Sequence, residues 1–180
     1  MASVGPKSPG TSSSSDQGLG SIIPWTNPNN NQSSDNAYAT AICSLVNGDF
    51  TEYLTATNFD FSAIPASATI EGIVVEIEKS ASGSIVDNSV KLIVAGSVSG
   101  DEKKDGAAWP GSDAYTTYGG IADRWGLFLT TSQVKASDFG VGISATRSGG
   151  ISPTASVDHV RMTVYYREDI FISVTGGQVL

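Results

Sequence analysis

Few side chains in this 180-residue chain could do acid–base or nucleophilic chemistry. The one histidine, His159, lies in a segment where apolar and polar residues alternate, which places its imidazole on the polar face of a strand. A Ser–His–Asp triad built with Asp158 fails, because neighbouring residues of a strand point to opposite faces. We therefore interpret His159 as a surface or interface residue and predict that the protein is not an enzyme.

Metal and carboxylate chemistry finds equally little support. One cysteine and one histidine cannot supply the ligands of a zinc site. The loop 101–105 is interpreted as a solvated hairpin tip, because its two lysines oppose cation binding, while Asp113 and Asp123 stay open as oxygen ligands. Glu76 and Glu78 face one side of a strand about 7 Å apart, a spacing compatible with glycoside hydrolysis but common on exposed strands. We predict no metal and no cofactor.

The most distinctive segment is a long loop that holds four aromatic side chains among glycines and small polar residues. These are Trp109, Tyr115, Tyr118 and Trp125. One interpretation packs the rings across the open end of a sandwich, and we favour it. The other makes them a contact surface, because Trp and Tyr bury large areas at low entropic cost and stack on sugar rings.

Composition excludes several classes of partner. A formal charge of −8 and an isoelectric point near 4.4 argue against a phosphate-binding face, so we predict no nucleic acid partner. The first residues lack the pattern of a signal peptide, and no apolar run approaches the roughly 20 residues that span a bilayer, so we predict no membrane partner. Cys43 has no second cysteine to pair with, and the fold is expected to be independent of oxidation.

Alternation of apolar and polar residues predicts strands over most of the chain. The predicted strands are 38–46, 51–59, 69–79, 89–95, 125–129, 139–146, 155–166 and 170–174. Their expected core residues are Ile73, Val75, Ile77, Val90, Leu92, Val94, Phe139, Val141, Ile143, Val160, Met162, Val164 and Tyr166. Only 130–135 competes as a short helix, with Thr130 and Gln133 at capping-box spacing. The pattern predicts an all-β fold, an antiparallel β-sandwich of the jelly-roll or immunoglobulin-like kind.

A series of motifs runs from PWTNPNN through SSDNAYATA, YLTATNFDFSAIPASATIEGIVVEIEKSASG, AWPGSDAYTTYGGIADRWGLFLT and SDFGVGISAT to ASVDHVRMTVYY. In this order the motifs resemble a family of virion structural proteins of tailed bacteriophages, over roughly residues 24–166. The resemblance implies a β-sandwich module that is carried on phage particles as a capsid decoration or cement protein, or as a tail component, without enzymatic activity.

The two ends of the chain lie outside this resemblance. Residues 1–23 are rich in Ser and Gly and too poor in apolar residues to fold alone, which predicts an extended N-terminal arm that a partner holds in place. The sandwich domain is expected over 24–166. Residues 167–180 form a C-terminal strand or arm, apolar on both sides, that needs a cover. The residues expected to bind a partner are Ile22, Ile23, Ile170, Phe171, Ile172 and Val174.

These expectations combine into a non-enzymatic capsid decoration, or cement, protein on the outer capsid surface of a virion that is assembled in the host cytoplasm. Its expected partners are the major capsid protein and further copies of itself, as a homo-oligomer that we take to be a trimer. Two alternatives stay open. One is a structural component of the tail, baseplate or neck, and the other is a carbohydrate-binding adhesin that grips host glycans with the aromatic loop.

Overall fold

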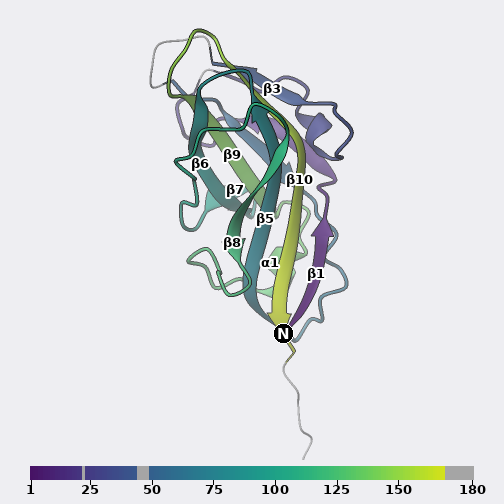
Figure 1. Cartoon of the computed structure of the whole chain (residues 1–180). Coiled ribbons are helices and arrows are strands. Elements are labelled where there is room, and N and C mark those ends of the chain that lie inside the picture. The colour runs from purple at the N-terminus through teal and green to yellow at the C-terminus, as the bar shows by residue number, and fades with distance from the viewer. Residues whose placement is uncertain (22, 44–48, 169–180) are drawn as a thin grey trace, which may run out of the picture.

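The computed structural model describes residues 1–21, 23–43 and 49–168. Two antiparallel sheets of five strands each pack face to face as a β-sandwich (Figure 1), so the predicted all-β class is confirmed. The helical content of the described residues is one α-helical turn and one 3-10 turn. They are α1 (Thr131–Val134) and η1 (Pro28–Asn31).

The first sheet, sheet A, is built on the two longest strands, β5 and β10. Its strand order is β1-β10-β5-β8, with β3 also pairing with β10. Its strands are β1 (Ala2–Lys7), β3 (Ala39–Ile42), β5 (Thr69–Ala81), β8 (Ala114–Gly120) and β10 (Thr154–Arg167). The second sheet, sheet B, has the order β2-β4-β9-β6-β7. Its strands are β2 (Thr11–Ser15), β4 (Tyr53–Thr57), β6 (Ile85–Val94), β7 (Ser97–Ser99) and β9 (Gly140–Arg147).

Period-two patterning locates the core correctly, because one face of each sheet is turned toward the other. Ile73, Val75 and Ile77 of β5 are fully buried. The other predicted core residues found buried are Val90, Leu92, Phe139, Val141, Ile143, Val160, Met162, Val164 and Tyr166. Val94, at the end of β6, is only half-buried.

The expected strand 125–129 is wrong. Trp125 and Gly126 both adopt left-handed backbone conformations, with φ of 55° and 69°, and these turn the chain out of any extended course. Phe128, three residues on, is 91% exposed. The short helix that follows is confirmed, with the Thr130 hydroxyl accepting from the Gln133 backbone and the Gln133 side chain accepting from the Thr130 backbone.

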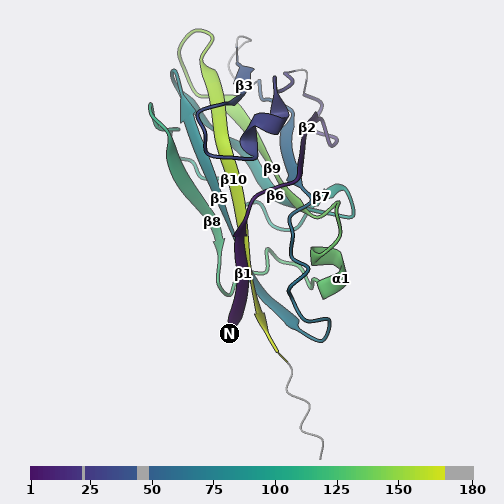
Figure 2. The same cartoon turned by 90° about the vertical axis from the view of Figure 1, so that its right-hand side faces the viewer.

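The predicted N-terminal arm, residues 1–23, is also wrong, because its residues form edge strands of both sheets. In sheet A, β1 pairs with β10, and Ala2 lies opposite Tyr166. In sheet B, β2 pairs with β4, and Ser13 lies opposite Thr55. The chain therefore passes from one sheet to the other at its start (Figure 2), and the sandwich begins at residue 2 rather than at residue 24.

Hydrogen bonds take the place of the apolar surface that the N-terminal segment lacks. Beyond the strand ladder, the hydroxyl of Ser12 donates to Asn31 Oδ1 over 2.5 Å, and that of Ser14 donates to Glu52 Oε2 over 2.6 Å. Ser13 Oγ and Thr55 Oγ1 lie 2.8 Å apart. Composition predicts disorder when apolar burial is the criterion, but a serine-rich segment satisfies its polar groups when it pairs with a formed sheet.

Ile23, expected to bind a partner, belongs to the core instead. Its side chain is 7% exposed and lies in the main apolar cluster. Its backbone accepts a hydrogen bond from the Glu52 amide, which fixes the entry into the sandwich beside β4. The other residues expected to bind a partner, Ile22, Ile170, Phe171, Ile172 and Val174, lie outside the described residues.

The long strands run between two ends of the sandwich. At one end, which we call the terminal pole, β1 begins beside the end of β10, and Arg167 of β10 pairs with Thr69, the first residue of β5. At the other end, the distal pole, Thr154 of β10 pairs with Ile42 of β3. In both views β1 and the end of β10 lie together at the terminal pole (Figures 1 and 2).

Candidate functional site

A lysine and an aspartate meet between the two sheets, inside the sandwich. Lys79 continues the inward face of β5 that Ile73, Val75 and Ile77 begin, and Asp87 occupies an inward position of β6. Because β5 and β6 are consecutive strands in opposite sheets, the two side chains approach each other across the core. Sequence analysis does not identify this site; the signal that could have found it is Lys79, a charged residue in phase with the apolar face of β5.

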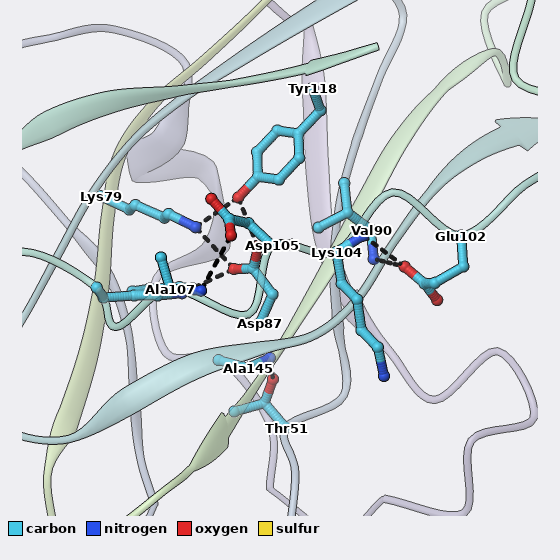
Figure 3. Close-up of polar contacts among 11 residues, drawn as sticks. Thr51, Lys79, Asp87, Val90, Glu102, Lys104, Asp105, Ala107, Tyr118 and Ala145 are labelled. Carbon is cyan, nitrogen blue, oxygen red and sulfur yellow. Dashed lines mark hydrogen bonds and ion pairs between the residues drawn. The ribbon is translucent and has the colours of Figure 1, made fainter.

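The lysine and the aspartate form an ion pair that is almost fully removed from water. Lys79 Nζ lies 2.7 Å from Asp87 Oδ1, and the two side chains are 2% and 0% exposed. The Lys79 ammonium also donates to the hydroxyl of Tyr118, a residue of β8. That hydroxyl in turn donates to Asp87 Oδ2 over 2.8 Å. The three polar groups thus close a ring of hydrogen bonds (Figure 3), which we call the inter-sheet cluster.

Two further donors complete the shell of the carboxylate. The indole N–H of Trp109 donates to Asp87 Oδ1 over 2.7 Å, and the backbone N–H of Asp105 donates to Oδ2 over 2.9 Å. Lys79 Nζ also lies 4.7 Å from the ring centroid of Trp109 and 5.2 Å from that of Tyr118, within the range of cation–π attraction. Asp87 therefore accepts four hydrogen bonds in a site walled by aromatic rings.

Burial sets the protonation chemistry of the inter-sheet cluster. Loss of water lowers the pKa of Lys79, and the charge of Asp87 opposes part of that shift. Burial, with the nearby carboxylate of Asp87, raises the pKa of Tyr118, so its hydroxyl keeps its proton and stays a donor. The cluster holds a nucleophilic nitrogen, a carboxyl group and a proton-carrying hydroxyl in mutual contact.

Three of the four loop aromatics are buried in the core. Trp109, Tyr118 and Trp125 are 4%, 3% and 0% exposed. Trp125 donates its indole N–H to the Ile73 carbonyl over 3.0 Å. Packing is thus the correct interpretation for these three, and the contact-surface alternative is wrong for them, because their rings are inside. Tyr115 alone is partly exposed, with the Arg161 guanidinium 4.1 Å from its ring centroid.

A second polar cluster surrounds His159 on the outer side of sheet A. Its Nε2 lies 2.9 Å from Ser8 Oγ, and its Nδ1 lies 2.8 Å from the Tyr115 hydroxyl. The ring is only 9% exposed, so the prediction of a surface position is wrong, and the polar face here is covered by the link between β1 and β2. A shift in strand register between 157 and 159 places Asp158 in a bulge.

This second cluster pairs a hydroxyl with an imidazole but lacks the third element of a nucleophilic triad. The group at Nδ1 is the neutral hydroxyl of Tyr115, which cannot stabilise an imidazolium as a carboxylate does. Burial also lowers the pKa of His159, which weakens it as a base. We interpret the contact as a tie that fastens Ser8, and with it the N-terminal segment, to β10.

The acidic residues considered as metal ligands are bonded to donors of the protein itself. Asp113 accepts from the Tyr38 and Ser80 hydroxyls, each over 2.7 Å. Asp123 forms an ion pair with Lys103 over 2.8 Å. Within the described part of the chain, no three His, Cys, Asp or Glu residues gather as a metal site would require.

Two further carboxylates, Glu76 and Glu102, also have structural partners. Glu76 forms a two-pronged ion pair with Arg161, at 2.9 and 2.8 Å. Glu102 accepts from the Val90 backbone and the Ser89 hydroxyl, each over 2.6 Å, and so binds the loop 101–105 to β6 (Figure 3). The loop is thus partly anchored rather than a freely solvated tip.

In a comparison with known proteins, no family model, curated protein or solved structure matches the chain. Over the described residues, none of the helices has the length and apolar character needed to cross a membrane.

Proposed function

We propose that the protein is a non-enzymatic structural module of a bacteriophage virion, a capsid decoration protein that binds the assembled lattice of the major capsid protein. The proposal draws on the ordered motifs between residues 24 and 166 and on the sandwich that carries them. It places the protein on the outer surface of the capsid, in contact with further copies of itself, with a trimer as the expected assembly.

The observation that carries the proposal is the geometry of the terminal pole. Ala2 lies opposite Tyr166, so β1 begins where β10 ends. Met1 and Ile121 are 73% and 58% exposed. Ile121 belongs to this pole because its backbone lies against Gly72, near the start of β5. Ile42, at the distal pole, is 58% exposed as well, so the choice of the terminal pole as the docking end rests on the meeting of β1 with the end of β10 there.

Such an attachment stabilises a shell by mass action. A protein that binds the assembled lattice, and not the free subunits, shifts the equilibrium toward the lattice by an amount that grows with its concentration. The module must itself resist opening under load, and the inter-sheet cluster serves that need by connecting β5 of sheet A to β6 of sheet B. The adhesin alternative loses Trp109, Tyr118 and Trp125 as sugar platforms, because their rings are buried.

Virions purified from wild-type phage and from phage lacking this gene test the proposal. Quantitative mass spectrometry of wild-type virions should find hundreds of copies per particle, whereas a few dozen or fewer would assign the protein to the tail, baseplate or neck. Particles without the protein should release their DNA at a lower temperature than wild-type particles. Absence of the protein from purified virions would refute both structural roles.

A further inference from the structure

We infer that Lys79 and Asp87 condense to an intramolecular isopeptide bond that joins the two sheets covalently. The inference stands on the inter-sheet cluster alone and is independent of the virion role. Lys79 Nζ already touches Asp87 Oδ1 at 2.7 Å, and both side chains are shielded from water. A nucleophile held against its carboxyl partner in a dry site has already lost the translational freedom that a reaction in solution would have to overcome.

Tyr118 is placed to move the protons. Its hydroxyl accepts from Lys79 Nζ and donates to Asp87 Oδ2, so it connects the group that must lose protons to the oxygen that must gain them. The two carboxylate oxygens also differ in their surroundings. Oδ1 receives the Trp109 indole N–H, a neutral donor that stabilises negative charge on the oxygen that is kept.

The step balances without any co-reactant. Lys79 Nζ attacks Asp87 Cγ, and a new N–C bond forms while the Cγ–Oδ2 bond breaks. Two protons of the ammonium pass through the Tyr118 hydroxyl to Oδ2, which leaves as water, and Oδ1 becomes the amide oxygen. An ammonium and a carboxylate are thereby converted to one amide and one water, and no atom is oxidised or reduced.

The surroundings favour the amide over the ion pair. An ion pair in a water-poor interior bears a desolvation cost that a neutral amide escapes. The amide would retain an acceptor oxygen for Trp109 and an N–H for the Tyr118 hydroxyl. Water released from so enclosed a site does not readily return to hydrolyse the bond.

Intact mass under denaturing conditions tests the inference directly. The purified wild-type protein should be lighter than its sequence by the mass of one water molecule. Cleavage after glutamate releases residues 79–102, which contain both partners and no internal glutamate. That peptide should carry the loss, and its fragmentation should yield no backbone ions between residues 79 and 87. A succinimide at Asp105–Gly106, which would lose the same mass, lies outside this peptide.

Two variants complete the test. Lys79→Arg keeps a cation beside Asp87 but lacks the reactive amine, so its mass should equal that of its sequence. Tyr118→Phe keeps the ring and removes the relay, and should slow bond formation by about 100-fold or more. A wild-type protein with the full mass of its sequence would overturn the inference, as would a loss of water that persists in the Lys79→Arg variant.

Discussion

Asp87 makes more of the hydrogen bonds in the inter-sheet cluster than Lys79 does, so its loss should destabilise the fold more. Replacing each residue by an apolar residue of similar shape tests this difference. Asp87→Leu leaves the Lys79 ammonium without its counter-charge and removes the acceptor of the Trp109 and Asp105 N–H groups and of the Tyr118 hydroxyl. Lys79→Met leaves a carboxylate that still accepts three of its four hydrogen bonds.

The magnitudes follow from these counts. Breaking a buried ion pair costs about 3–5 kcal/mol, and each buried donor left unsatisfied costs about 1–3 kcal/mol more. We expect the free energy of unfolding of Asp87→Leu to lie about 3 kcal/mol or more below that of Lys79→Met, because three buried donors lose their acceptor. Both substitutions abolish the isopeptide bond alike, so the bond itself does not contribute to the difference between them.

Urea unfolding followed by tryptophan fluorescence measures both variants, since Trp109 lies in the cluster itself. Asp87→Asn, which retains one acceptor oxygen, gives an intermediate value and a fallback if Asp87→Leu does not fold. A Lys79→Met variant that loses as much stability as Asp87→Leu, or more, would refute the assignment of the carboxylate as the centre of the cluster.

Three further predictions concern other parts of the sandwich. Burial lowers the pKa of His159, so the fold favours the neutral ring and the free energy of unfolding should fall as the pH drops below about 6.5. His159→Gln should remove this part of the pH dependence, and identical slopes of unfolding free energy against pH between 7.5 and 5.5 in both proteins would contradict the reasoning. Gly140→Ala should lower the free energy of unfolding by about 3 kcal/mol or more, because a Cβ there would lie 1.9 Å from the Ala56 carbonyl oxygen. Gly106→Ala, which has open space around it, should leave the stability measured by thermal unfolding unchanged. Val4→Asp should lower the free energy of unfolding by about 1–3 kcal/mol, since Val4 packs against the core, and Ser3→Asp on the exposed side should lower it by under about 0.5 kcal/mol. Equal effects of the two substitutions would mean that β1 is not part of sheet A.

Period-two patterning recovered those elements whose apolar faces are uninterrupted. β5 buries every second residue from Ile73 to Ala81, while β9 and β10 bury their apolar faces together with several of the residues between, and the sequence predicts all three strands to within a few residues. β8 escaped detection because glycines and threonines surround its two tyrosines, and its stability comes from pairing with β5 rather than from its own composition.

The inter-sheet cluster and the N-terminal strands were missed for a shared reason. Lys79 and Asp87 are charged residues at core positions, and only their partners across the sheets make those positions tolerable. Likewise, the serines of β2 satisfy their hydroxyls through residues distant in the chain, such as Asn31 and Glu52. Local composition cannot report contacts that only the assembled fold creates.

A reconstruction of the virion from electron cryomicroscopy tests the proposed role most directly. It should show copies of the sandwich standing on the outer face of the shell, with the terminal pole against the coat lattice and the distal pole, where Ile42 and Thr154 pair, turned to solvent. Density that places the distal pole on the lattice, or a shell that carries no such sandwich, would contradict it.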